Sequence, residues 1–131
     1  MTKTAVRTDG APAPVSGAPY SQAIVAGGLV FVSGQVPVDP ATGSLVDGGI
    51  AEHTHRCFDN IAAILAEAGS GFDRLVKTTV FLRHMSDFAG MNAVYAERVP
   101  APFPARAAVE VSELPVPGAL VEVEVVALAG G

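Results

Sequence analysis

The spacing of apolar positions divides the chain into strand-like and helix-like segments. Apolar residues recur every three or four positions over 50–68 and 87–99, which predicts two amphipathic helices. Short runs rich in Val, Ile, Leu and Ala predict strands at 4–8, 21–26, 29–33, 75–82, 105–111 and 119–128. This order predicts a single α+β domain, with a mixed sheet of about six strands and both helices packed on one face.

Turn residues mark the connections between these segments. Gly27-Gly28 separates two short apolar runs and predicts a tight hairpin. Residues 37–49 carry turn signals and predict a long loop. Residues 1–17 predict an N-terminal strand followed by a Pro-rich entry loop. No linker or repeat interrupts the chain, so we expect one domain over 1–131.

The last predicted strand has one face that fits neither a core nor a solvated surface. Its core face carries Val121, Val123, Val125 and Ala127. Its opposite face carries Leu120, Glu122, Glu124, Val126 and Leu128. This face combines three large aliphatic side chains with two carboxylates, so we expect a neighbouring subunit to cover it and a site to lie within it.

Arg106 is the candidate partner for these carboxylates. It lies on the same face of the predicted strand 105–111 as Ala108 and Glu110, because the three are two residues apart. If the last two strands pair, Arg106 comes near Glu122 or Glu124 on the same covered face. Two interpretations remain open: a cross-strand ion pair that only satisfies itself, or a guanidinium that binds a small carboxylate beside a carboxylate that acts as a base.

Composition and charge narrow the choice of function. Only 16% of residues are charged, against about 25% in an ordinary soluble domain, which again indicates a hidden surface. The net charge is −5 and no cluster of Lys or Arg occurs, so a nucleic-acid partner is not expected. No apolar run is long enough to span a membrane, and no secretory signal is recognisable. With the lone Cys57 unable to form an internal disulfide, we expect a cytoplasmic protein.

The segment His53-Thr-His55-Arg-Cys57 has the residue types of a metal site. On a helix, however, only His53 and Cys57 share a face, and no fourth ligand lies nearby in the sequence. Cys57 falls on the apolar stripe, where a thiol packs rather than reacts. We therefore expect no metal and no cysteine nucleophile.

Five segments in order resemble the RidA (YjgF) family of imine/enamine deaminases. They are APYSQA (18–23), LVFVSGQVPVDPATG (29–43), DRLVKTTVFLRHMSDFAGMNAVYAE (73–97), PARAAVEVSELP (104–115) and ALVEVEVVA (119–127). The resemblance covers about residues 12–128 and implies a chorismate-mutase-like fold. It also implies a homotrimer with active sites in the clefts between subunits.

The resemblance further implies a reaction and its residues. The family hydrolyses 2-imino acids or their enamine tautomers, which pyridoxal-phosphate-dependent dehydratases release, to 2-oxo acids and ammonia without a cofactor. Its carboxylate-binding arginine falls on Arg106 and its water-positioning glutamate on Glu122. Its pocket tyrosine, serine and asparagine fall on Tyr20, Ser33 and Asn92.

Two positions depart from the family pattern, and two other functions remain open. Ala18 stands where members usually have Gly, and Ala108 where many carry Cys or Thr. The first alternative is a trimeric module that binds small carboxylates with little turnover, which the missing polar group at Ala108 leaves possible. The second is an endoribonuclease or translation inhibitor, which the net charge disfavours.

Overall fold

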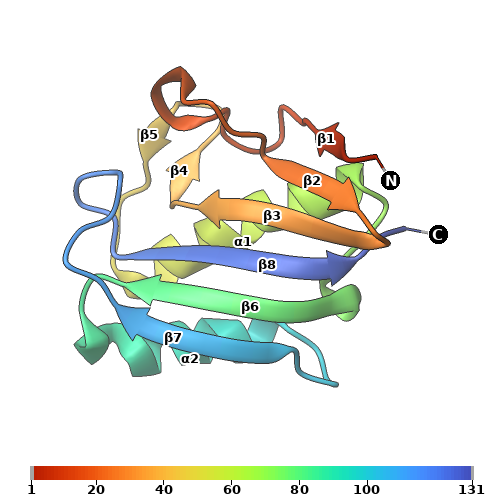
Figure 1. Cartoon of the computed structure of the whole chain (residues 1–131). Helices are drawn as coiled ribbons and strands as arrows, with labels where there is room; N and C mark the ends of the chain where they lie inside the picture. The colour runs from red at the N-terminus through yellow and green to blue at the C-terminus, as the bar shows by residue number, and fades with distance from the viewer. Residues whose placement is uncertain (1, 131) are drawn as a thin grey trace.

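The protein has two layers, a sheet and a pair of helices, as Figure 1 shows for the computed structural model, which describes residues 2–130. The six-stranded sheet has the order β1-β2-β3-β8-β6-β7. Its strands are β1 (Thr4–Val6), β2 (Ala23–Ala26), β3 (Leu29–Gln35), β6 (Leu75–Leu82), β7 (Ala105–Glu110) and β8 (Val121–Leu128). Helices α1 (Ile50–Glu67) and α2 (Phe88–Arg98) both lie behind the sheet in Figure 1. The predicted α+β class is therefore confirmed.

Local sequence explains where the elements begin and end. The β2–β3 hairpin turns at Gly27 and Gly28, whose φ values of 59° and 78° suit glycine. Helix α1 ends before Gly69, which has a φ of 73° and stops the helix in the left-handed region. The apolar stripe of α1 is buried against the sheet, with Phe58, Ile61 and Ile64 completely inaccessible.

The segment 37–49, expected to be a loop, contains a second small sheet. Strands β4 (Val38–Asp39) and β5 (Ser44–Leu45) form a short antiparallel hairpin. The Asp39 carboxylate accepts a hydrogen bond of 2.8 Å from the Ala41 backbone N–H, and Gly43 has a φ of 73°. The turn signals of this segment were thus recognised, but the two-residue strands on either side are too short to show a period.

Strand β7 does not pair with β8, contrary to the pairing considered from the sequence. It runs parallel to β6, which lies between β7 and β8. A parallel pair needs a long crossover, and α2 supplies it between β6 and β7. Strand β7 is consequently an edge strand, two positions away from β8.

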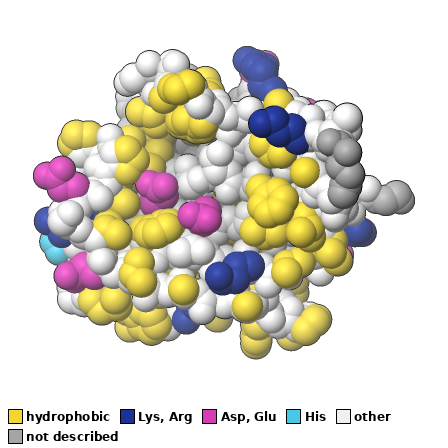
Figure 2. Space-filling view, viewed as in Figure 1, with side chains coloured by type: hydrophobic (Ala, Val, Ile, Leu, Met, Phe, Trp, Pro, Cys, Tyr) yellow, Lys and Arg dark blue, Asp and Glu magenta, His cyan; other side chains and the backbone are white. Residues whose placement is uncertain are grey.

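The sheet has a buried face and an open face. The buried face packs under α1 and α2. Neither helix, nor any other in the described part of the chain, is long and apolar enough to cross a membrane. The open face, toward the viewer in Figure 2, carries apolar side chains with few charges. Phe31, Val109 and Leu128 are 45%, 43% and 47% exposed there. An exposed apolar face of this kind is typical of an interaction surface.

Candidate active site

The five residues singled out from the sequence fall into two groups on opposite faces of the sheet. On β6, Arg106 of β7 pairs with Thr78, whereas Glu122 of β8 pairs with Phe81. Positions an odd number of residues apart on one strand face opposite ways, so Arg106 and Glu122 do too. The expectation that Arg106 lies near Glu122 or Glu124 on one face of the same chain is wrong.

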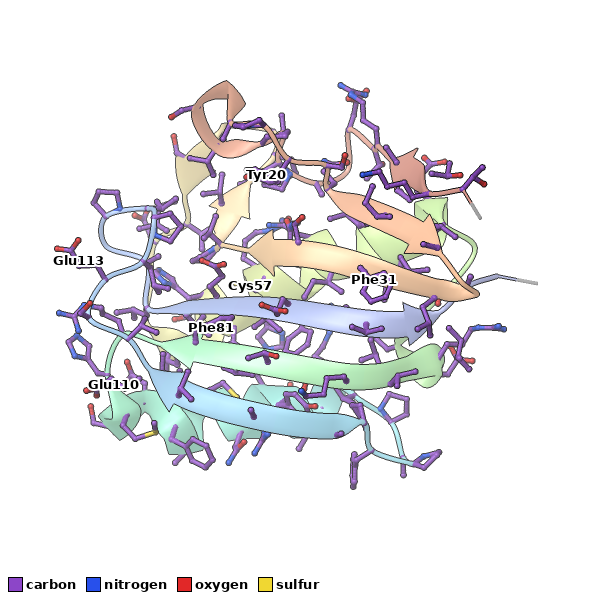
Figure 3. All side chains as sticks on the ribbon, in the orientation of Figure 1. Tyr20, Phe31, Cys57, Phe81, Glu110 and Glu113 are labelled. Carbon is purple, nitrogen blue, oxygen red and sulfur yellow. The ribbon has the colours of Figure 1, made fainter. Side chains whose placement is uncertain are left out.

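The first group, Tyr20, Ser33 and Glu122, lines a hollow of about 370 Å³ at one end of the open face. Tyr20 precedes β2 and lies above the C-terminal half of β3 in Figure 3. Ser33 belongs to β3 and Glu122 to the adjacent β8. Two hydroxyls and one carboxylate thus surround a space large enough for a small organic acid.

Both hydroxyl groups are held by backbone groups of the segment that precedes β2. The Tyr20 hydroxyl accepts a hydrogen bond of 2.7 Å from the Val15 N–H. The Ser33 hydroxyl donates one of 2.6 Å to the Ser21 carbonyl. Each hydroxyl keeps further hydrogen-bonding capacity for a ligand, since an oxygen with one donor and two lone pairs has used only one of these.

Glu122 is a half-buried carboxyl group beside a glycine that makes room for it. The register between β3 and β8 shifts between Val32 and Gln35, and Gly34 lies in this irregular stretch. A Cβ atom at Gly34 would lie 2.9 Å from the Glu122 Cδ, closer than real contacts allow. Only glycine therefore leaves the carboxylate its place. A glycine inside a strand is a signal for such a close approach, although the sequence analysis did not use it.

Burial raises the pKa of the Glu122 carboxyl above its usual value, and the negative charge of Glu124 raises this pKa further. A carboxylate with a raised pKa is a stronger base than an ordinary glutamate. It is also protonated at a higher pH, so any role as a base is lost on acidification over a higher pH range than usual. The hollow therefore contains a group suited to accept a proton from water.

We expect Glu124→Gln to lower the pKa of Glu122. The substitution removes the like charge and leaves the larger contribution from burial, so the pKa of Glu122 falls but stays above its usual value. A ¹³C-carboxyl NMR titration, with the Glu122 signal assigned by its loss in Glu122→Gln, measures this change. Glu113→Gln, which replaces another exposed glutamate, is the matched control. An unchanged Glu122 titration in Glu124→Gln would contradict the assigned cause.

The second group, Arg106 and Asn92, lines a hollow of about 430 Å³ on the helix side of the sheet edge. The Asn92 Oδ1 accepts a hydrogen bond of 2.6 Å from the Arg106 Nη1. The Arg106 Cζ lies 4.7 Å from the centre of the Tyr95 ring and 5.5 Å from that of Phe88. These rings and the amide fix the plane of the guanidinium.

This group is arranged to bind an anion. A guanidinium has five N–H donors, of which Asn92 occupies one, and the Arg106 side chain is exposed. The remaining donors match the two oxygens of a carboxylate. Tyr95 and Phe88 belong to the apolar stripe over 87–99 that predicted this helix. Their stacking on Arg106 depends on the pairing of β7 with β6, which brings the edge strand over α2.

The structure also locates the two departures from the family pattern. Ala18 lines the Glu122 hollow with a φ of −61°, an extended conformation that alanine adopts without strain. Ala108 pairs with Val80 and faces the same side as Arg106, two residues along β7. The first change is thus compatible with the backbone, and the second removes a side chain's polar atoms near Arg106.

The residues of the metal-like segment are held by other contacts. His53 and Cys57 share one face of α1, as predicted, and both are buried there, although the sequence analysis had no signal for the burial of His53. His55 points toward α2, where its Nδ1 accepts a hydrogen bond of 3.1 Å from Arg98. Among residues 2–130, no group of three or more His, Cys, Asp or Glu side chains has metal-binding geometry.

Comparison with known protein sequences shows matches over almost the whole chain. The family model described as Endoribonuclease L-PSP matches residues 10–129. A RutC family protein of Pyrococcus abyssi is 50% identical over 97% of this chain and 98% of its own length. The human 2-iminobutanoate/2-iminopropanoate deaminase is 42% identical over 92% of this chain and 87% of its own length.

Solved structures show the same fold. Yeast Mmf1 has a TM-score of 0.90 at 42% identity, covering 97% of this chain and 98% of that one. RidA from an Antarctic Psychrobacter has a TM-score of 0.89 at 41% identity, covering 95% of this chain and 98% of that one. Both the residues and the backbone of this chain are therefore similar to those of these two proteins over at least 95% of its length.

Proposed function

Because the chain belongs to the RidA (YjgF) family, we propose that it hydrolyses reactive 2-imino acids, or their enamine tautomers, to 2-oxo acids and ammonia. The observation that carries this proposal is the half-buried Glu122 carboxyl, whose pKa is raised, in a hollow lined by two hydroxyl groups. The exposed Arg106 guanidinium, oriented by Asn92, supplies the complementary carboxylate site. The relatives named as imine deaminases support the same reaction.

The mechanism needs only the side chains of this chain. Arg106 binds the substrate carboxylate and orients the C=N bond. Glu122 takes a proton from water as the water oxygen bonds to the carbon of the protonated imine, which gives a neutral carbinolamine. The same carboxyl group then returns that proton to the amino nitrogen. As the C–N bond breaks, the Glu122 carboxylate accepts the hydroxyl proton, so the carbon becomes the 2-oxo group, and ammonia leaves and carries this proton away as ammonium. Tyr20 and Ser33 hydrogen-bond the substrate carboxylate or the water.

The two half-sites support a homotrimer as part of the proposal. Arg106 and Glu122 lie on opposite faces of one sheet, so a site that uses both takes them from two chains. The apolar open face, with Phe31 and Leu128 nearly half exposed, is suited to cover a neighbouring copy. Sedimentation equilibrium tests this assembly, and a monomer would contradict the shared site.

A coupled reaction tests the function. Threonine and a threonine dehydratase generate 2-iminobutanoate, and semicarbazide traps the free imine. We expect the protein to suppress the semicarbazone and to speed release of 2-oxobutanoate. An unchanged yield of semicarbazone at stoichiometric protein would contradict the proposal.

A carboxylate-binding module with little turnover is the second candidate. Ala108 favours it, because the methyl group offers no hydrogen bond to a substrate held at Arg106. Calorimetric binding of 2-oxobutanoate by a protein that leaves the semicarbazone yield unchanged would identify this function.

We expect Gly34→Ala to lower kcat by about 100-fold with little loss of stability. The new methyl group meets the end of the Glu122 side chain, which moves aside without disturbing the backbone. A displacement of about 1 Å at a reacting group can lower the rate by about 10². Gly49→Ala is the matched control, since a Cβ at Gly49 lies 3.8 Å from the nearest atom of Glu52. Steady-state kinetics and thermal unfolding measure both effects, and wild-type kcat in Gly34→Ala would contradict them.

A further inference from the structure

Helix α1 contains a buried histidine whose two ring nitrogens both contact backbone atoms. His53 is 3% exposed. Its Nδ1 accepts a hydrogen bond of 3.2 Å from the Leu120 N–H, and its Nε2 lies 3.1 Å from the Val46 carbonyl oxygen. Because the Leu120 amide is a donor, Nδ1 carries no proton, so Nε2 carries it and donates to Val46. The two contacts therefore fix the ring orientation and the tautomer of His53.

The residue that His53 holds is next to the strand that carries Glu122. Leu120 immediately precedes β8, and Glu122 follows two positions later. The preceding segment has few backbone donors and little regular structure, because Pro115 and Pro117 lack an N–H. The Leu120 carbonyl accepts a hydrogen bond of 3.0 Å from the Arg83 N–H. His53 thus supplies the side-chain contact that fixes the entry of β8 from the helix layer.

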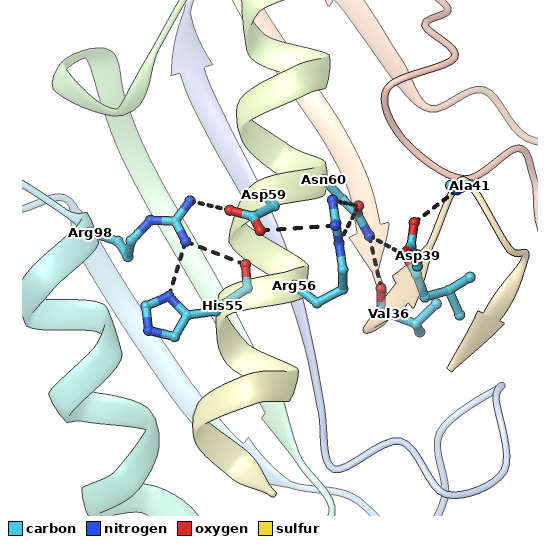
Figure 4. A network of polar contacts seen from close by, with 9 residues as sticks. Val36, Asp39, Ala41, His55, Arg56, Asp59, Asn60 and Arg98 are labelled. Carbon is cyan, nitrogen blue, oxygen red and sulfur yellow. Dashed lines mark hydrogen bonds and ion pairs between the residues drawn. The ribbon is translucent and has the colours of Figure 1, made fainter. Parts of the chain in front are cut away.

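The same helix holds the opposite wall of the Glu122 hollow. Two turns after His53, the buried Asn60 donates hydrogen bonds of 3.2 Å to the Val36 carbonyl and 3.0 Å to the Val38 carbonyl, and Figure 4 shows its contact with Val36. Val36 lines the Glu122 hollow. Buried polar side chains of α1 therefore hold both backbone segments that flank the carboxylate.

We propose that His53 is a positioning residue, which acts through the Leu120 N–H to hold the Glu122 carboxyl in its half-buried place. The proposal rests on the proposed function only for its effect on the reaction. The contact itself predicts that replacing His53 changes the titration of the Glu122 carboxyl, whether or not the protein is an enzyme. Without an acceptor at the Nδ1 position, the start of β8 loosens and water reaches the carboxyl more freely.

Three variants separate this contact from general stability. His53→Leu fills the space but offers no acceptor to Leu120. His53→Asn retains an acceptor, because its Oδ1 lies where Nδ1 lies in histidine. His55→Asn is the matched control, since it replaces a histidine of the same helix that contacts Arg98 instead of β8. Unfolding by urea measures the free energy of unfolding of each variant.

The test uses two readouts. In the ¹³C-carboxyl NMR titration of the whole protein, we expect the pKa of Glu122 to fall toward its usual value in His53→Leu and to stay raised in His53→Asn and His55→Asn. In steady-state imine hydrolysis, we expect kcat to fall about 10-fold or more in His53→Leu, with KM little changed. In His53→Leu, the acid limb of the pH profile of kcat should shift together with the pKa of Glu122. A loss of folded protein alone would lower the rate without shifting this limb.

The possible outcomes are distinct. A folded His53→Leu with the wild-type Glu122 titration overturns the positioning role, as does a His53→Asn that loses the raised pKa while remaining folded. If His53→Leu does not fold, His53→Asn decides between these results through its Glu122 titration. A shifted titration in a protein without imine hydrolysis supports the positioning role and contradicts the proposed function.

Discussion

Replacing Arg106 with Ala is expected to lower kcat/KM for 2-imino acids by about 100-fold, which corresponds to about 3 kcal/mol of lost binding in the transition state. The loss should be mainly in KM, because the guanidinium holds a substrate carboxylate that does not itself react. Arg106 is exposed and bonds only the Asn92 side chain among the described residues, so the fold should tolerate the change. Steady-state kinetics with the dehydratase-generated imine measure the effect.

Arg106→Lys and Arg7→Ala are the controls for this prediction. Lysine keeps the positive charge but not the planar pair of donors, so it should restore only part of the binding. Arg7 follows β1, forms an exposed ion pair with Asp9 and lines neither hollow, so its loss should leave KM unchanged. Equal KM values for wild type and Arg106→Ala would remove Arg106 from the site.

Mixing variants tests whether the site is shared between chains. Arg106→Ala lacks one half-site and Glu122→Gln lacks the other. Refolded together, they should form mixed trimers in which about one of three sites is complete and has the wild-type kcat/KM, whereas each variant alone keeps only its own lowered kcat/KM. No recovery of activity in mixed trimers, confirmed by mass spectrometry, would show that both residues act within one chain or that one of them is dispensable.

Replacing Glu122 with Gln is expected to lower kcat by about 10²–10⁴-fold, the usual contribution of a general base. Glutamine keeps the size and hydrogen bonding of the side chain but cannot take a proton from water. KM should change little, because Arg106, the proposed carboxylate-binding residue, belongs to the other hollow. Single-turnover measurement of 2-oxo acid release separates this chemical step from product release.

Stability should distinguish the loss of Glu122 from damage to the fold. Burial and Glu124 raise the pKa of Glu122 in the folded protein. Ionised Glu122 therefore destabilises the folded state at pH values above that raised pKa, and the penalty disappears as the carboxyl is protonated at lower pH. We expect Glu122→Gln to unfold no more easily than wild type at neutral pH. A lower free energy of unfolding would mean that the activity loss reports damage to the fold.

Much of the fold follows from local patterns. Both helices and the strands 75–82 and 119–128 were predicted within about two residues, because their periods of 3.6 and 2 repeat often enough to be recognised. Glu122 was placed on the open face of its strand for the same reason, since its neighbours Val121 and Val123 are completely buried. The hairpin β4–β5 was missed because two residues per strand show no period.

The sequence by itself determined which side chains share a face within each strand, and it supplied the carboxylate, the guanidinium and the family to which they belong. Only the tertiary structure decided how strands separated by helices lie relative to one another. Alternation along β7 shows that Arg106 and Ala107 point to opposite faces. It does not show which face Arg106 shares with residues of β8 until the strand between β7 and β8 is known. The crossover through α2 puts β7 beside β6, so that β6 lies between β7 and β8. In this register the Arg106 side chain faces α2, where it stacks on the Tyr95 ring while staying exposed. That single pairing separates Arg106 from Glu122 and makes a second chain necessary for a site that uses both.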